Sequence, residues 1–368
     1  MTRGPLNSLS YSLRRCIFVV IAVVGAFTAV PSTTATASVV FSTFVSGSDI
    51  NAVEGQQNTI AFNYAGNKFV GSVYFGGNNL QLFQTDLTGH NVAFFGSPLP
   101  TGGGEVVIGA SLGQAGFAKG DIYASGDNHI YHYANSGGSP TLFGTTPDNS
   151  GIRQIFFDPG SSFGGNMLVT TTSGNIYKFD SAGNPSLVAS VHEDTEGIDI
   201  APSTWGAFAG DLMVSSEGSG QLRMISPTGA VTDTGLFIPA AETVSFVPLN
   251  LGLSGNPLEG FYVANFPVDI QKASASQFAG LQGDAIITSE FGSNAPLWDV
   301  KFTGGGFVLG NSGNPIGFLP NQSEDGIFVT AERVNDLNPV PEPASLILLA
   351  TGGMVMAGRR LLRRGRAA

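Results

Sequence analysis

Three glutamates and one arginine recur at one fixed distance before the end of a short apolar segment. The segments end at Ser111, Pro159, Pro202 and Pro248. Six positions earlier in each stand Glu105, Arg153, Glu196 and Glu242. If the segments lie side by side, the three carboxylates converge and repel one another unless a cation neutralises them. Because carboxylate oxygens are ligands for hard cations, the pattern predicts a Ca²⁺ site with Asp199 or Asn314 nearby. The alternative is that the glutamates pair with the arginine and need no cofactor.

The elements that carry these residues repeat along the chain. Three segments align around an acidic or amide residue placed just before an apolar strand, at 45-residue intervals: Asp121, Asn166 and Asp211. Each full copy reads as four short strands, with glycines at hairpin turns that need positive φ and prolines at strand ends. Four strands in about 45 residues is the size of one propeller blade.

The Gly-Asp strand and the Asp-x-x-Gly turn make the body similar to β-propellers of the NHL-repeat and gluconolactonase-like kind. The resemblance implies an all-β fold of six blades, in which the first strand of each blade lines a central channel. The four charged residues would then meet at one mouth of the channel. A seventh blade is the alternative, with strands at 316–320 and 326–332 and with residues 39–45 closing the ring.

The same resemblance also implies a catalytic function. Gluconolactonase-like enzymes hold a divalent ion in the channel to activate water. Glu196-Gly197, at the start of an inner strand, resembles the acidic ligand position of that family. The aromatic residues Trp205, Tyr262 and Trp298 are interpreted either as platforms for sugar rings or as packing between blades.

The N-terminal segment, residues 1–37, is predicted to be a secretory signal peptide. Arg14 and Arg15 precede an apolar run of about 14 residues, shorter than the ~20 that a membrane span needs. Ala35-Thr36-Ala37 follows as the site for signal peptidase.

The C-terminal segment has three parts in order. Pro341-Glu342-Pro343 comes first, an apolar run over 345–358 follows, and an arginine cluster begins at Arg359-Arg360. This arrangement resembles the PEP-CTERM sorting signal of Gram-negative bacteria that make exopolysaccharide. The resemblance implies transient anchoring in the inner membrane by a hydrophobic sorting helix, with the arginines on the cytoplasmic side. It also implies removal of the tail near the Pro-Glu-Pro triplet by an exosortase.

The predicted organisation is a signal peptide at 1–37, a propeller domain at 38–335 and a sorting signal at 336–368. Charge limits the partners, because residues 38–339, the body ahead of the Pro-Glu-Pro region, hold 8 basic residues against 26 acidic ones, a net charge of −18. Such a body repels nucleic acid and suits cations, or polymers bridged by cations. The single cysteine, Cys16, lies in the leader, so no thiol serves the body.

Together these features predict an exported cell-surface or extracellular protein. Its propeller is expected to be a non-catalytic binding or scaffold module associated with exopolysaccharide. The alternative is a divalent-metal-dependent hydrolase or lyase that uses the channel mouth.

Overall fold

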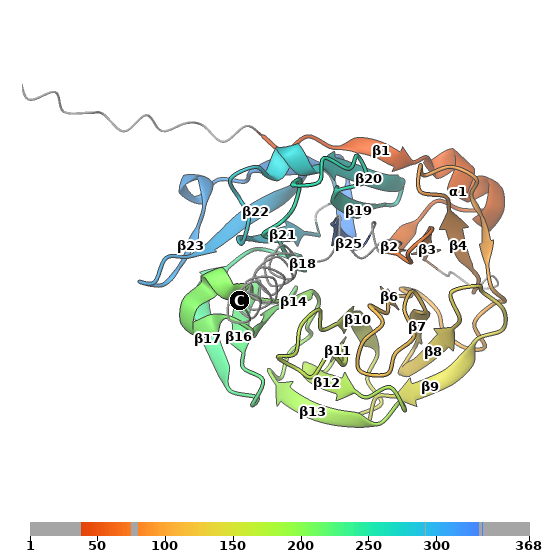
Figure 1. The fold of residues 1–368 in the computed structure, drawn as a ribbon, viewed down its shortest axis with the longest axis horizontal. Helices are drawn as coiled ribbons and strands as arrows, with labels where there is room; N and C mark the ends of the chain where they lie inside the picture. The colour runs from red at the N-terminus through yellow and green to blue at the C-terminus, as the bar shows by residue number, and fades with distance from the viewer. Residues whose placement is uncertain (1–37, 75–79, 291, 331–332, 334–368) are drawn as a thin grey trace, which may run out of the picture. The chain divides into compact units, whose positions relative to one another are not determined.

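The structure of the protein is a computed structural model, which describes residues 38–74, 80–290, 292–330 and 333. Within these residues the strands form six antiparallel sheets, and the innermost strands follow one another in a closed ring (Figure 1). The ring order of the innermost strands is β2, β6, β10, β14, β18, β25 and again β2. The sequence prediction of an all-β, six-bladed propeller is therefore confirmed.

Blades one to four each run from the innermost to the outermost strand in chain order. Blade one holds β2 (Thr59–Tyr64), β3 (Phe69–Val73), β4 (Leu82–Thr85) and β5 (Ala93–Phe95). Blade two holds β6 (Ile108–Ala110), β7 (Ile122–Gly126), β8 (His129–Tyr133) and β9 (Thr141–Thr145). Blade three holds β10 (Ile152–Phe157), β11 (Met167–Thr171), β12 (Asn175–Phe179) and β13 (Pro185–Ser190). Blade four holds β14 (Ile198–Ile200), β15 (Leu212–Ser215), β16 (Gln221–Ile225) and β17 (Val231–Phe237).

The repeated acidic or amide residue marks the start of a second strand. Strands β7, β11 and β15 begin directly after Asp121, Asn166 and Asp211. The preceding Gly120 and Gly210 have φ of 76° and 85°, a region that residues with a Cβ rarely adopt. The turn before the second strand thus requires a glycine, and the glycine recurs because the same turn recurs in these blades.

Blades five and six are interleaved. The chain forms β18 (Ala241–Phe246), leaves to build β19 (Gly260–Phe266) and β20 (Asp269–Ser274), and then returns for β21 (Ala285–Ser289), β22 (Ala295–Phe302) and β23 (Phe307–Leu309). A short strand, β24 (Gly317–Leu319), pairs with β22 in blade five. The innermost strand of blade six, β25 (Gln322–Val329), comes last, and β1 (Ser42–Val45) forms its outermost strand.

This interleaving corrects the alternative of a seventh blade. The two C-terminal segments proposed for it belong to blades five and six, and β1 closes the ring by pairing with β20. Phe44 of β1 anchors the closure, with its ring centroid 4.8 Å from that of Tyr262 and 5.2 Å from that of Phe69.

The helical elements named in the described residues are α1 (Gly47–Glu54) and the 3₁₀ turns η1 (Ser203–Phe208), η2 (Ala275–Phe278) and η3 (Asn311–Gly313).

The two predicted targeting segments, 1–37 and 336–368, lie outside the described residues, as does the expected sorting helix. In the part that is described, no helix combines the length and the apolar character that a bilayer crossing requires. The domain boundaries therefore stay a prediction.

Candidate functional site: the acidic channel mouth

Arg153 of β10 sits among three carboxylates at the end of the channel where the innermost strands begin. Its Nη1 lies 2.6 Å from Oε2 of Glu105, its Nη2 2.6 Å from Oδ2 of Asp194, and its Nε 3.1 Å from Oε1 of Glu196. Burial alone would lower the pKa of Arg153, but a hydrogen bond to Asp194 and the surrounding negative charges raise it. The structure thus brings Glu105 and Glu196 together with the arginine, which is the pairing that the second interpretation of the pattern predicts.

Glu242 lies next to Glu196 but has no arginine. The main-chain carbonyl of Glu242 accepts hydrogen bonds from the Gly197 N–H (2.7 Å) and the Ser215 hydroxyl (2.8 Å), which fixes blade five against blade four. Glu242 is only 8% exposed, and among the described residues its carboxylate has no hydrogen-bond or ion-pair partner. Burial and the neighbouring glutamates raise the pKa of Glu242 well above its usual range.

Burial also raises the pKa of Glu196, while Arg153 opposes the rise and Asp194 and Glu105 add to it. An ionised carboxylate in such surroundings is costly unless a positive charge compensates it. Arg153 supplies that charge on the Glu196 side of the mouth. Nothing comparable faces Glu242 within the described part of the chain.

Three more glutamates belong to this cluster, which we call the acidic mouth: Glu217, Glu290 and Glu324. Burial and a hydrogen bond with Glu217 raise the pKa of Glu290 to about 8. Burial, then the charges of Glu290 and Glu105, raise the pKa of Glu324 to about 9. The Gln322 amide donates to Oε1 of Glu324 at 2.6 Å and also to Glu290, so it ties blade six to blade five.

Strand register explains why these side chains meet. Arg153, Glu242 and Glu324 lie on β10, β18 and β25, and Glu196 lies two residues before β14; each stands four residues before an inner-strand residue, respectively Phe157, Phe246, Phe328 and Ile200. Phe157, Ile200 and Phe246 pair with the first residue of their blade's second strand, and Phe328 pairs with the second residue of β19. Glu217 and Glu290 stand three residues after Val214 and Ile287, which pair with equivalent inner-strand positions.

Two residues of the acidic mouth that the sequence prediction did not include, Glu217 and Glu290, lie in a recognisable sequence pattern. Ser-Ser-Glu at 215–217 and Thr-Ser-Glu at 288–290 end equivalent second strands, so an alignment of those strands would have found Glu217 and Glu290. Glu324 carried no such signal, because the innermost strand of blade six follows an interruption and does not end at a proline.

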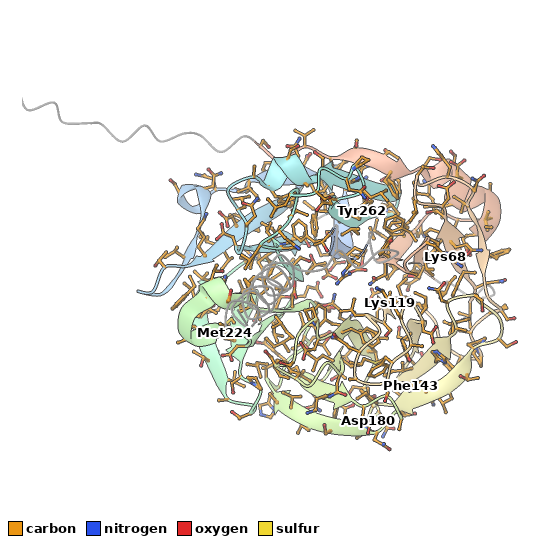
Figure 2. All side chains as sticks on the ribbon, viewed as in Figure 1. Lys68, Lys119, Phe143, Asp180, Met224 and Tyr262 are labelled. Carbon is orange, nitrogen blue, oxygen red and sulfur yellow. The ribbon has the colours of Figure 1, made fainter. Side chains whose placement is uncertain are left out.

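Asp199 does not join the acidic mouth. It lines a cavity of about 750 Å³ at the other end of the channel, where the innermost strands finish. Its Oδ2 accepts a hydrogen bond from the Phe246 N–H at 2.7 Å, and burial raises its pKa to about 7 while this bond lowers it. Figure 2 shows Lys119, another lining residue of this cavity, toward the middle of the ring and Asp180 at its rim.

Asn314 is also remote from the mouth, because it follows η3 in the exposed connection between β23 and β24. The other predicted functional residues lie outside the described residues: Ala35, Ala37, Pro341, Glu342, Pro343, Arg359 and Arg360.

The chemistry of the acidic mouth suits a hard cation, because its donors are carboxylate oxygens and one of its glutamates, Glu242, has no ion-pair partner among the described residues. The carboxylates of the acidic mouth are not positioned as the ligands of a metal centre. Among the described residues no three His, Cys, Asp or Glu side chains are grouped closely enough to hold one ion. Binding at Glu242 would require nearby glutamates to change rotamer.

Comparison with known proteins identifies the tail. Residues 339–364 match the PEP-CTERM protein-sorting motif. The motif implies export and membrane-associated sorting with exosortase processing. The chain is therefore a PEP-CTERM-sorted, exported protein that carries a six-bladed propeller.

The propeller itself has structural neighbours at low sequence identity, whereas no curated protein matches the chain in sequence. A streptogramin B lyase structure is 12% identical, with 77% of this chain and 76% of that chain covered and a TM-score of 0.47. Virginiamycin B lyase from Staphylococcus aureus is 12% identical, with coverages of 69% and 84% and a TM-score of 0.40. A nidogen/laminin complex gives 12% identity, coverages of 76% and 82%, and a TM-score of 0.43.

Proposed function

We propose that this protein is a non-catalytic binding or scaffold propeller of the cell surface, which associates with exopolysaccharide through Ca²⁺ held at the acidic mouth. The observation that carries the proposal is Glu242, a residue that is 8% exposed and whose carboxylate has no ion-pair or hydrogen-bond partner within the described residues. Its glutamate neighbours add negative charge and supply none of the compensation it lacks. A divalent cation bound at the Glu242 carboxylate would compensate its negative charge, as Arg153 compensates the negative charge of Glu196.

Association with a polymer follows from the charge of the body. The body has a net charge of −18, so an anionic polysaccharide would be repelled unless a cation stands between the two. Ca²⁺ takes six to eight oxygen ligands and would keep positions open for carboxylates or hydroxyls of the polymer. The exposed carboxylate of Glu105 places one edge of the acidic mouth at the surface of the propeller.

Calorimetric titration with CaCl₂ at pH 8 tests the proposal. Wild-type protein is expected to bind Ca²⁺, and Glu242→Gln is expected to bind at least tenfold more weakly because it removes a carboxylate ligand that has no arginine partner. Glu54→Gln is the matched control, since Glu54 is also a buried glutamate (7% exposed) but lies on α1. The absence of binding heat in the wild type, or equal affinity in Glu242→Gln, would contradict the proposal.

Retention on a column of immobilised alginate, an anionic polysaccharide, then tests the link to the polymer. Wild-type protein is expected to be retained in Ca²⁺ and released by EDTA, whereas Glu242→Gln elutes early in both. A metal-dependent hydrolase or lyase is the alternative, in which a metal bound by carboxylates of the acidic mouth would activate water. It predicts new reducing ends or unsaturated sugars from the polymer in the presence of metal, and intact polymer supports the binding role.

A further inference from the structure

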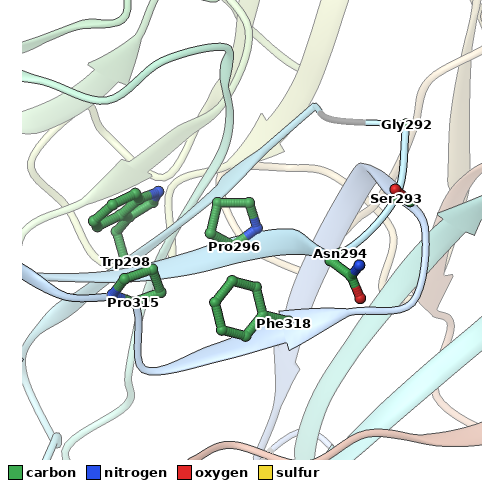
Figure 3. Close-up of a pocket in the computed structure, with 7 residues that line it drawn as sticks. All are labelled: Gly292, Ser293, Asn294, Pro296, Trp298, Pro315 and Phe318. Atoms are coloured by element: carbon green, nitrogen blue, oxygen red, sulfur yellow. The ribbon is translucent and has the colours of Figure 1, made fainter.

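A second hollow lies on the outer part of blade five, away from the channel. Its volume is about 520 Å³, within the range of about 300–1,000 Å³ that small-molecule sites occupy. Figure 3 shows the rings of Trp298, Pro296, Pro315 and Phe318 gathered along β22 and β24, with Ser293 and Asn294 at the hairpin end. We call this hollow the aromatic pocket; Gly292 completes its lining.

Strand geometry builds the aromatic pocket. Pro296 and Trp298 are two residues apart on β22 and so project from the same face. Phe318 stands directly opposite Pro296 in the β22–β24 register. The eight-residue β22 is too long for the three-residue β23 to cover, and β24 pairs with the uncovered part and brings Phe318 to this face.

The aromatic surface of the pocket is fixed before any ligand arrives. Trp298 donates its indole N–H to the Ser289 hydroxyl at 3.2 Å, which sets the plane of the ring and leaves no buried donor unsatisfied. One side of Trp298 packs on the core between blades four and five. Phe318 remains 51% exposed. Of the three aromatic residues singled out in the sequence, Trp205 and Tyr262 are buried, so only Trp298 is available to a ligand.

The lining indicates what kind of ligand fits. It combines flat apolar rings with a hydroxyl and an amide at one end, and none of its seven residues carries a charge. The Asn294 side-chain amide makes no hydrogen bond within the described residues, so it is free to bind a ligand. A pyranose ring has matching chemistry, because its C–H face is apolar and its edge carries hydroxyls.

A peptide strand fits the site less well. The edge of β24 that would receive such a strand is already bridged by Val39, whose N–H donates to the carbonyl of Ile316 at 2.7 Å. We propose that the aromatic pocket binds an uncharged pyranose unit of a polysaccharide by stacking on Trp298 and Phe318. This binding needs no metal, so it goes beyond the proposed Ca²⁺ role of the acidic mouth and does not depend on it.

Tryptophan fluorescence offers a direct test, because the chain has two tryptophans and the other, Trp205, is 2% exposed with its N–H bonded to the Gly283 carbonyl. The purified protein is titrated in EDTA with cellohexaose and with maltohexaose, two uncharged hexasaccharides. At least one of them is expected to shift or change the emission. Trp298→Phe is expected to keep the Trp205 emission and lose the response.

Phe318→Ala should weaken binding about tenfold, the scale of one aromatic contact. Phe237→Ala is the matched control, because Phe237 is an exposed phenylalanine (62%) on β17 of blade four and lines no part of the pocket. Calorimetry confirms the affinities, and far-ultraviolet circular dichroism confirms that each variant is folded. The proposal is overturned if neither hexasaccharide gives a response, or if Phe237→Ala weakens binding as much as Phe318→Ala. Because EDTA removes Ca²⁺, failure here is separate from failure of the acidic mouth.

Discussion

Replacing Glu324 by glutamine should stabilise the protein at pH 8 and leave its stability nearly unchanged at pH 5. Glu324 has its pKa raised to about 9, first by burial and then by the charges of Glu290 and Glu105. In the unfolded chain a glutamate has a pKa of about 4.3. Folding therefore takes up a proton at this site between those two values, and stability falls as the pH rises through that interval.

The size of the effect follows from proton linkage. One proton taken up on folding changes the free energy of unfolding by about 1.4 kcal/mol per pH unit, or about 4 kcal/mol between pH 5 and pH 8. Because the neighbouring glutamates share the proton uptake, we expect about 2–4 kcal/mol for Glu324→Gln. Glutamine preserves the shape of the side chain, and its amide can still meet Gln322, which donates to Glu324 in the wild type.

Urea unfolding followed by tryptophan fluorescence at pH 5 and pH 8 measures this difference. Asp180→Asn is the control, since it removes one negative charge from an exposed turn at the rim and should leave the pH dependence unchanged. If Glu324→Gln proves no more stable than wild type at pH 8, Glu324 is ionised and compensated in the native state. The raised pKa of Glu324, and with it the uncompensated charge of the acidic mouth, would then be refuted.

Two further substitutions test other parts of the fold. Arg153→Met should lower the free energy of unfolding by about 3–5 kcal/mol at pH 8, because it leaves the buried Glu196 carboxylate without its compensating charge. The loss should be smaller at pH 5, where the carboxyl group is more readily protonated. Urea titration at both pH values measures the difference. Phe44→Ala should lower stability by about 2–3 kcal/mol in thermal unfolding, because Phe44 packs on Phe69 and Tyr262 where β1 closes the ring; Val40→Ala, at a side chain 63% exposed, should change stability little.

The local parts of the fold were predictable from the sequence. Glycine turns, alternating apolar residues and the 45-residue spacing depend only on neighbours in the chain, and they located β7, β11 and β15 to the residue. The alignment on strand ends also brought Arg153 and Glu196 together correctly. In blade two the alignment was wrong by one residue, because the strand register makes Val106 the equivalent of Arg153. Glu105, the more exposed residue before Val106, nevertheless forms an ion pair with the arginine.

The sequence alone determined two things about this protein: its sorting tail and the blade as a repeating unit. Both are short-range patterns that a linear reading can see. Only the tertiary structure decided how the ring closes and what gathers at its mouth. Blade six joins strands from residues 42–45, 260–274 and 322–329, and only this pairing places Gln322 where it donates both to Glu324 and to Glu290 of blade five. Strand pairing between distant segments depends on which faces remain to be buried, and that is settled only when the whole propeller forms.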